Sequence, residues 1–420
     1  MGVGVTVRVT PVAADAAAAH APPFALGVAL FHQGSEQLPG LGAMLAARAR
    51  TLPAPPSALA WDFLAIAAAA YAADRFVLRS RSADRWTRNI GLSVALADPA
   101  PWRSQAIALA SALRFLTGDI WHLDLRDGGS PPPAFRAKPH SYDSVCLFSG
   151  GLDSFLGALE LRNAGRSPLL VSQGSAKEIS PQLALAAGLG LLEQRFEGRI
   201  RERWRQPYEP STRARSILFY GYGVIAASAT GLREVVVPEN ALIAVNPPLT
   251  RRRIGSLSTR TVHPHLLASL NGVLAGAGLD VSLTNPFRAT TKGEMLANAR
   301  HADLQELASR SYSCGKGKRG NGQCGRCVPC LIRRASFQAA AVQDGTTYLS
   351  TLALSTRNDD VLAARQGAAR AAAMTERELE RWILRAGPLP SDPAERREIV
   401  QAVGRGMIEL RELFQDVAWR

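Results

Sequence analysis

A short apolar run that leads through two glycines into a helical pattern constrains this chain more than any other feature. Residues 145–148 are apolar, residues 155–161 have helical spacing, and six residues join them: Ser149, Gly150, Gly151, Leu152, Asp153 and Ser154. Two glycines let consecutive N–H groups converge on an anion, and the positive end of the helix strengthens the attraction. We therefore predict a phosphate-binding turn, with Ser149 and Ser154 as hydroxyl donors and Asp153 holding Mg²⁺ or orienting the loop.

This turn lacks the lysine of the Walker phosphate loop. A chain of this kind is therefore not expected to cleave a nucleotide between its β and γ phosphates. The alternative is a glycine turn in an ordinary α/β protein. We favour phosphate binding because the flanking strand and helix supply the required context.

Short apolar runs alternate with helical stretches from residue 143 to about residue 288. The expected strands are residues 144–148, 169–172, 234–237 and 280–283, and the expected helices are residues 151–163, 213–229 and 265–274. Alternation of this kind predicts an α/β fold with a doubly wound parallel sheet, whose ligand lies at the carboxyl ends of the strands.

Proline-rich stretches and pattern changes divide the chain into three parts. Residues 1–138 are expected to form an α+β domain, residues 139–350 the doubly wound domain, and residues 351–420 a helical C-terminal extension. In the first part we expect helices at 60–73 and 102–116 and strands at 75–79, 88–96 and 121–125. Its polar residues are interpreted as structural rather than as a docking surface: Asp74, Arg75, Trp86, Arg88 and Asp119. The C-terminal extension shows amphipathic helices at 375–385 and 394–414.

Four of the five cysteines fall within seventeen residues: Cys314, Cys324, Cys327 and Cys330. Four thiolates at such intervals can surround Zn²⁺ in a tetrahedron, and a site with four protein ligands has no open position. We therefore predict a structural zinc site at residues 314–330. An iron–sulfur cluster is the rival, and unligated surface thiols are the third interpretation. Cys146 lies inside a strand and is expected to be a core residue.

The positive charge of the chain is dispersed rather than gathered in one segment. The net charge is +14, and only five of the 49 basic residues are lysines. A dispersed positive charge raises affinity for any polyanion, ATP included, and does not define a nucleic-acid groove. We therefore do not favour a nucleic-acid partner, although one is possible. The longest uncharged apolar stretch, residues 63–73, is well short of the roughly 20 residues of a spanning helix. No secretory signal pattern opens the sequence, so we expect a cytoplasmic protein without membrane contact.

The segment SGGLDS after a strand resembles the signature of the PP-loop (HUP-like) ATP pyrophosphatases. That resemblance implies ATP cleavage between the α and β phosphates, with residues 149–154 holding the pyrophosphate. Downstream, residues 291–294 (TKGE), 311–314 (SYSC) and 324–330 (CGRCVPC) make residues 141–340 similar to the QueC family of 7-cyano-7-deazaguanine synthases. This similarity implies that 7-carboxy-7-deazaguanine becomes an acyl adenylate that an amine attacks. In QueC the amine is ammonia, and a second adenylation dehydrates the amide to a nitrile.

Two polar segments are candidate parts of the site. Glu239 and Asn240 follow the strand at 234–237, where they could read a ring N–H and a base amide; an ordinary turn is the alternative. Thr291 and Glu294 form a capping-box pattern that starts a helix expected at 295–307. Lys292 then lies beside the positive helix end and is expected to contact phosphate, the alternative being an exposed first-turn lysine.

Residues 258–264 (STRTVHP) depart from QueC, whose proteins carry a tyrosine, proline, aspartate, cysteine and arginine segment there that helps hold the substrate. Arg260 can pair with a carboxylate or phosphate in bidentate fashion, and Thr261 joins it as a predicted substrate-binding residue. His263 can take a proton from an amine because its pKa lies near neutrality, although a structural role is the alternative. We thus predict Asp153, Lys292, Arg260 and His263 as catalytic residues.

The altered segment, the N-terminal domain and the helical extension make the chain resemble the QueC-like proteins of bacterial anti-phage clusters, in particular the QatC proteins of the Qat system. For these the resemblance implies that the N-terminal amine of a partner protein, encoded in the same defence cluster, attacks the activated carboxylate. Residues 1–138 and 351–420 would offer the docking surface. The alternatives are a 7-cyano-7-deazaguanine synthase proper, a tRNA-modifying PP-loop enzyme and a nucleotide-binding scaffold without catalysis.

Overall fold

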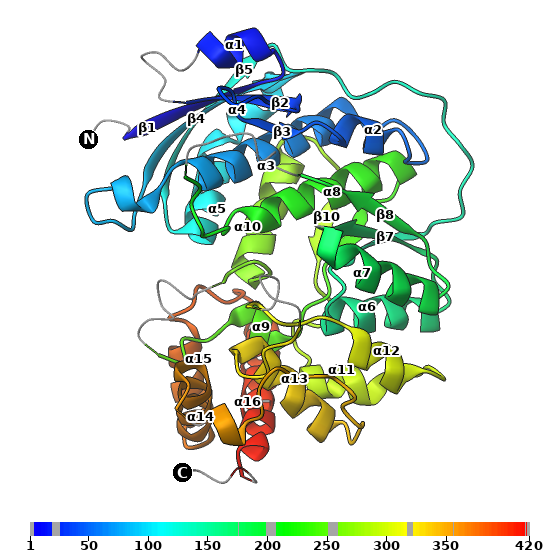
Figure 1. The fold of residues 1–420 in the computed structure, drawn as a ribbon, viewed down its shortest axis with the longest axis vertical. Coiled ribbons are helices and arrows are strands. Elements are labelled where there is room, and N and C mark those ends of the chain that lie inside the picture. Colours follow the sequence, from blue (N-terminus) through cyan, green and yellow to red (C-terminus); the bar gives the residue numbers. More distant parts are fainter. Residues whose placement is uncertain are drawn as a thin grey trace.

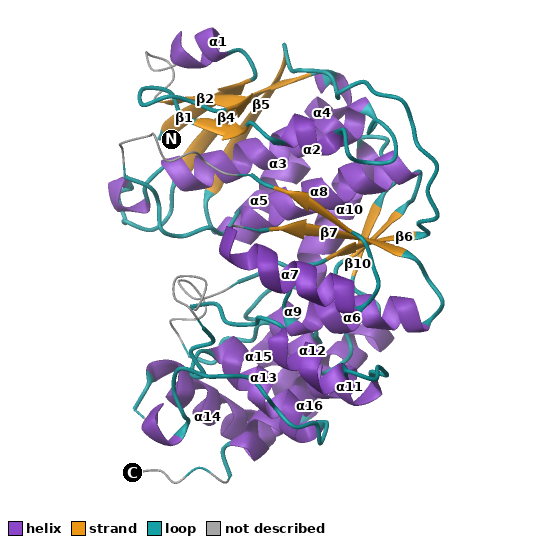
Figure 2. Ribbon diagram, turned by 45° about the vertical axis from the view of Figure 1, so that its right-hand side comes forward, coloured by secondary structure: helices purple, strands orange, loops and turns teal. Residues whose placement is uncertain are grey.

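Two five-stranded sheets with helices between them form most of the molecule (Figure 1). The structure is a computed structural model that describes residues 4–18, 26–174, 176–198, 207–250, 259–316, 322–355, 357–415 and 417. Figure 2 shows the N-terminal sheet at one end of the long axis and a group of C-terminal helices at the other. The second sheet lies between them.

The N-terminal sheet has the strand order β3-β2-β1-β4-β5, and all its pairs are parallel. Its strands are β1 (Val5–Thr10), β2 (Leu26–His32), β3 (Gly40–Gly42), β4 (Asn89–Leu96) and β5 (Ile120–Asp127). Parallel strands require crossover connections, and the helices of this part are α1 (Ala13–Ala18), α2 (Leu45–Ala49), α3 (Ala58–Phe76), α4 (Pro99–Ser104) and α5 (Ala106–Thr117). The α+β expectation for residues 1–138 is therefore corrected to α/β. The single helix expected at 102–116 is two helices that meet at Gln105.

Charged residues of this part form a buried ion network instead of a strand or a docking surface. Residues 75–79, expected to be a strand, end α3 and enter a 3₁₀ turn. The reason is tertiary: Nη2 of Arg79 and Nη2 of Arg88 lie 2.8 and 2.6 Å from Oδ2 of Asp119, and Arg88 also pairs with Asp74. All four side chains are buried, which supports their structural interpretation.

The second sheet confirms the predicted doubly wound arrangement. Its order is β10-β9-β6-β7-β8 with all pairs parallel, and its strands are β6 (Ser144–Leu147), β7 (Pro168–Gln173), β8 (Glu193–Phe196), β9 (Glu234–Val236) and β10 (Ser282–Thr284). The sequence pattern did not indicate β8, because three of its four residues are polar and only Phe196 is fully buried. Chain order reverses between β6 and β9, which marks the crevice where such sheets bind ligands.

The two sheets share one hydrophobic core. Helices of the second sheet include α6 (Leu152–Asn163), α7 (Ala176–Gly188), α8 (Arg215–Thr230) and α10 (Pro264–Gly276). Helix α8 packs against both α3 and β6, and an added Cβ at Gly221 of α8 would lie only 3.0 Å from Leu64 of α3. Val94 of β4 and Val145 of β6 belong to the same cluster of buried side chains. Residues 1–138 are therefore packed against the second sheet through α3.

The remaining helices gather below the second sheet (Figure 1). They are α9 (Ala241–Val245), α11 (Lys292–Asn298), α12 (Leu304–Arg310), α13 (Val328–Ala339), α14 (Asp359–Ala372), α15 (Glu376–Ile383) and α16 (Pro393–Leu413). The expected helix at 295–307 is thus broken into α11 and α12, whereas the two predicted C-terminal helices are confirmed as α15 and α16. Among the described residues, no helix is both long and apolar enough to span a membrane.

Candidate functional site

The turn after β6 combines a glycine in the left-handed region with the N-terminus of helix α6. Gly150 has a φ of 76°, in the left-handed region that favours glycine, and a Cβ added there would lie 2.8 Å from Cγ of Gln182. Gly151 caps α6 without a side-chain hydrogen bond. The N–H of Leu152 has Ser313 Oγ at 3.4 Å, a long hydrogen bond. The N–H of Leu152, at the start of α6, can therefore donate to a stronger acceptor such as a phosphate oxygen.

The two serines of the loop form a hydrogen bond with each other. Ser149 Oγ and Ser154 Oγ lie 3.2 Å apart, and Ser154 Oγ donates to the carbonyl oxygen of Gly151 at 3.0 Å. Gln182 of α7 donates from Nε2 to the carbonyl oxygen of Ser149 at 3.1 Å, and it is almost fully buried. The sequence analysis missed Gln182, because nothing in its local pattern distinguishes it from any other helical glutamine.

A close contact brings the loop's helix against the neighbouring strand. A Cβ added at Gly157 in α6 would lie 2.3 Å from Cβ of Pro238, which follows β9. This approach brings Asp153 of α6 to the residues after Pro238. A glycine inside a helical pattern was the available signal, since it commonly marks close packing.

Four polar side chains converge where β6 and β9 end. Nζ of Lys292 lies 2.7 Å from Oδ2 of Asp153, and Nδ2 of Asn240 donates to Oδ1 of Asp153 at 3.0 Å and to Oε1 of Glu239 at 3.4 Å. Asp153, Lys292 and Asn240 are 8%, 2% and 0% exposed. The structure therefore brings together four of the predicted site residues, from three separate segments. The exposed-lysine alternative for Lys292 is excluded.

The charges of this cluster are unequally distributed. Burial opposes ionisation of Asp153, but Lys292 and hydrogen bonds from Glu239 and Asn240 outweigh it and lower the pKa of Asp153. Burial and the adjacent Asp153 charge raise the pKa of Glu239 well above its usual 4.5. The pKa values of the two carboxyl groups are therefore shifted in opposite directions, as expected for two acids that share a confined site. Asp153, whose pKa is lowered, is the one that contacts Lys292.

The helix that carries Lys292 begins as predicted. Thr291 Oγ1 accepts from the N–H of Glu294 at 3.0 Å, and Glu294 Oε2 accepts from the N–H of Thr291 at 2.9 Å, so the capping box is confirmed. Asn240 likewise caps α9, with Oδ1 accepting from the N–H of Ile243 at 3.2 Å. Both caps anchor site residues at helix N-termini.

Arg260, Thr261 and His263 lie on the side of the N-terminal domain. Arg260 places its guanidinium 4.7 Å from the ring centroid of Phe115 and donates to that residue's carbonyl oxygen at 3.1 Å. The carbonyl oxygen of Thr261 accepts from the hydroxyl of Tyr220. Burial, and after it the charge of Glu239, raises the pKa of that hydroxyl, and the sequence analysis missed Tyr220. Ser258, in the same segment, lies outside the described residues.

His263 caps α10 from a buried position. Its Nδ1 accepts from the N–H of His265 at 3.2 Å, and its side chain is 0% exposed. Burial, followed by the charges of Arg260 and His265, lowers the pKa of His263 to about 3. The imidazole is therefore neutral over the physiological range. The geometry matches the structural alternative, and the role of proton acceptor stays a prediction.

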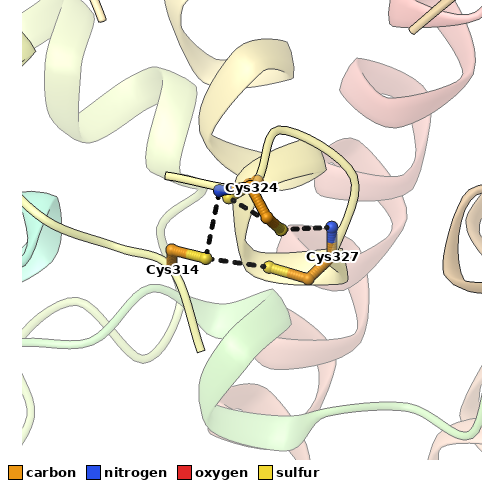
Figure 3. A group of neighbouring side chains, drawn as sticks. Cys314, Cys324 and Cys327 are labelled. Carbon is orange, nitrogen blue, oxygen red and sulfur yellow. Dashed lines mark hydrogen bonds between the residues drawn. The ribbon is translucent and has the colours of Figure 1, made fainter. Parts of the chain in front are cut away.

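The four clustered cysteines meet around one point, and Figure 3 labels three of them, Cys314, Cys324 and Cys327. Their Sγ atoms all lie within 4.8 Å of one another, with Cys314 to Cys327 at 3.8 Å and Cys324 to Cys330 at 3.9 Å. A tetrahedral Zn–S distance of about 2.3 Å requires sulfur separations of about 3.8 Å. The four thiols therefore have a spacing that fits a metal ion such as Zn²⁺. Cys146 is buried in β6, as expected of a core residue, and burial raises the pKa of its thiol to about 12.

The cysteine cluster is joined to the anion-binding loop by residues 311–314. The N–H of Tyr312 donates to the carbonyl oxygen of Gly150 at 2.7 Å, and Ser313 Oγ is the acceptor for Leu152 described above. Arg333 of α13 is fully buried and donates to Ser311 Oγ at 2.8 Å and to Ser313 Oγ at 3.4 Å. A metal at Cys314 would therefore restrain the segment that supports Gly150.

Comparison with known proteins relates part of the chain to one family. Residues 210–341 match the family model described as the queuosine biosynthesis protein QueC. The chain is 26% identical over 221 residues to 7-cyano-7-deazaguanine synthase 1 of Sulfurisphaera tokodaii, covering 49% of this chain and 98% of that relative. It is 29% identical over 233 residues to the 7-cyano-7-deazaguanine synthase of Ralstonia nicotianae, covering 49% and 98%. The family-model match does not include residues 149–154, so the interpretation of that loop depends on its own sequence and geometry.

Proposed function

We propose that the protein is an ATP-dependent ligase that adenylates a 7-deazaguanine carboxylate and transfers the acyl group to an amine. In the first step a carboxylate oxygen attacks the α phosphorus, and the bond from that phosphorus to its bridging oxygen breaks. Pyrophosphate leaves, and an acyl adenylate remains. In the second step the amine nitrogen attacks the acyl carbon, AMP leaves, and the nitrogen gives up a proton.

One observation carries this proposal: an anion-binding loop without a Walker lysine opens onto a buried Asp153–Lys292 pair at the switch point of a parallel sheet. An ammonium beside the loop can stabilise charge that develops on the phosphates, and a fixed position lets it do so without reorganisation. The similarity to 7-cyano-7-deazaguanine synthases supports a deazaguanine carboxylate as the substrate.

Each residue of the cluster has a proposed task. Residues 149–154 hold the pyrophosphate, and Lys292 contacts a phosphate oxygen. Asp153 would supply the oxygen ligand for Mg²⁺, which neutralises phosphate charge when bound. In its protonated form, which the raised pKa favours, Glu239 can donate a hydrogen bond to the base. Asn240 donates to both carboxyl groups. Zn²⁺ at the cysteine cluster would be structural, since four thiolates leave no coordination position open.

The amine that accepts the acyl group is the second part of the proposed reaction. We propose the N-terminus of a partner protein encoded in the same anti-phage cluster as the acceptor, in a cytoplasmic reaction. One supporting feature is the segment at residues 258–264, which differs from the segment expected for QueC. The other is the additional chain length, since the similarity to the relative from Sulfurisphaera tokodaii covers 49% of this chain, and we propose residues 1–138 and 351–420 as the docking surface. Arg260 and Thr261 are the proposed substrate contacts beside the acceptor.

Pyrophosphate release is the direct test. We expect release from ATP that depends on 7-carboxy-7-deazaguanine, and loss of release in Asp153→Ala with zinc at the cysteine cluster unchanged, because Asp153 is not one of the four thiol ligands. Mass spectrometry then identifies the product. A modified N-terminal peptide of the partner supports the conjugation step, a nitrile formed with ammonia supports the synthase reaction, and no release with any deazaguanine carboxylate contradicts the proposed function.

A further inference from the structure

The C-terminal helix α16 contacts three short helices whose N-terminal ends carry the candidate site. It packs against α9, α11 and α13 (Figure 1). Asn240 caps α9, Lys292 is the first residue of α11, and Cys327 caps α13. The contact with α9 is close, since a Cβ added at Gly406 of α16 would lie 3.3 Å from Leu242. Residues of α16 are therefore in a position to set where these helices begin.

One carboxylate of α16 holds the residues on both sides of Lys292. The hydroxyl of Thr291 donates to Oε1 of Glu409, and the N–H of Gly293 donates to Oε2 of Glu409 at 3.3 Å. A Cβ added at Gly293 would lie 2.5 Å from Oε1 of Glu409, so glycine at this position gives the carboxylate access to the backbone. The side chain of Lys292 itself contacts Asp153.

A second residue of α16 supports the same helix start. Arg405, one turn before Glu409, pairs with Glu294 and donates from Nη2 to the carbonyl oxygen of Ala289 at 3.2 Å. Glu294 is also the acceptor for the N–H of Thr291. The first turn of α11 is therefore stabilised by side chains of α16 as well as by its own capping box. A negative charge at a helix N-terminus, such as that of a carboxylate, is also favourable.

We infer that Glu409 is a positioning residue for Lys292, and that the C-terminal extension is part of the catalytic domain rather than an appendage. This inference depends on the proposed function. Lysine carries its charge on a flexible four-carbon stem, so the place of Nζ depends on a fixed backbone. Glu409 fixes that backbone at residues 291 and 293. Loss of its charge would leave the lysine present but its ammonium poorly placed for the phosphates.

A double-mutant cycle on the full-length protein tests the inference. The variants are Glu409→Gln, Lys292→Ala and the double variant, with Glu412→Gln, exposed on the same helix, as the matched control. The probe is α,β-methylene ATP with Mg²⁺, whose dissociation constant is measured by calorimetry. Thermal unfolding checks that each variant is folded.

We expect Glu409→Gln to weaken binding by about tenfold, the scale of one charged hydrogen bond, and to have no further effect once Lys292 is alanine. The Glu412→Gln variant should bind like the wild type. An equal effect of Glu409→Gln in both backgrounds, or no effect with Lys292 present, overturns the inference and leaves the proposed function intact. If the wild type does not bind the analogue, or Lys292→Ala binds it equally well, the proposed role of this site fails first and the inference fails with it.

Discussion

Replacement of Lys292 by methionine tests the buried ion pair most directly. Methionine keeps most of the length of the lysine stem and removes the ammonium, whereas Asp153 and Glu239 remain. In the wild type, Nζ lies 2.7 Å from Oδ2 of Asp153, and the side chains of Lys292 and Asp153 are 2% and 11% exposed. The variant therefore leaves two carboxyl groups in a buried site with Asn240 as a donor and without their cation.

Breaking a buried pair from one side costs about 3–5 kcal/mol, because the remaining charge is no longer compensated. We expect that loss for Lys292→Met at pH 8. Asp153→Asn should lose less, since Glu239, whose pKa is raised chiefly by burial and by the Asp153 charge, can then ionise beside Lys292. A loss of several kcal/mol is a large part of the total stability of a protein.

The pH dependence has a defined sign. In the wild type the pKa of Asp153 is lowered, so its contribution to stability is present above its usual 3.8 and is lost as the pH falls through the folded value. Without Lys292 the pKa of the same carboxyl rises, so the variant regains stability as the pH falls from 8 toward 4. The difference between the two proteins should therefore be largest at pH 8 and smaller at pH 5.

Urea unfolding followed by tryptophan fluorescence at both pH values measures this difference. The Asp153→Asn variant is the comparison for the opposite side of the pair. A loss of less than about 1 kcal/mol at pH 8, the range of exposed ion pairs, would refute the reasoning. So would a loss of equal size at pH 5.

Three further changes test other parts of the site. Metal analysis of the wild type should find near one zinc per chain, whereas iron with visible absorbance would favour the iron–sulfur alternative. Cys327→Ser should abolish the bound zinc and speed hydrogen exchange in residues 149–154. Gly157→Ala should destabilise the protein by about 1–3 kcal/mol through overpacking against Pro238, whereas Gly272→Ala, with no atom within 4 Å of the added Cβ, should stabilise α10 slightly in the same melting experiment. His263→Asn retains a capping side chain, so the pH–rate profile should keep its shape between pH 6 and 8; disappearance of a limb near pH 6.5 would instead identify His263 as the proton acceptor.

Local patterns were sufficient to predict the parts of the site that lie within a few residues of each other. The strand, glycine turn and helix around residues 149–154 were predicted, as was the capping box of Thr291 and Glu294. The spacing of the cysteines likewise predicted a cluster with metal-binding separations. In each case, residues close in sequence determine the geometry.

The N-terminal domain shows where such patterns fail. Residues 75–79 alternate like a strand, but Arg79 lies in a buried network with Asp119, and Arg75 donates to the carbonyl oxygen of Glu209. Tertiary contacts thus override the local pattern. Strand β8 was missed because it has no apolar pattern. Its polar residues are only partly buried, at the edge of the sheet.

The sequence by itself determined the glycine turn between strand and helix, the cluster of four thiols that could hold a metal, and the doubly wound class, because each depends on short-range spacing. Only the tertiary structure decided that Asp153 meets Lys292, that burial and the Asp153 charge raise the pKa of Glu239, and that Glu409 holds the start of α11. These partners are more than 50 residues apart along the chain, and their charges depend on burial. Burial and long-range contact arise only when sheets and helices pack together, and no local pattern encodes them.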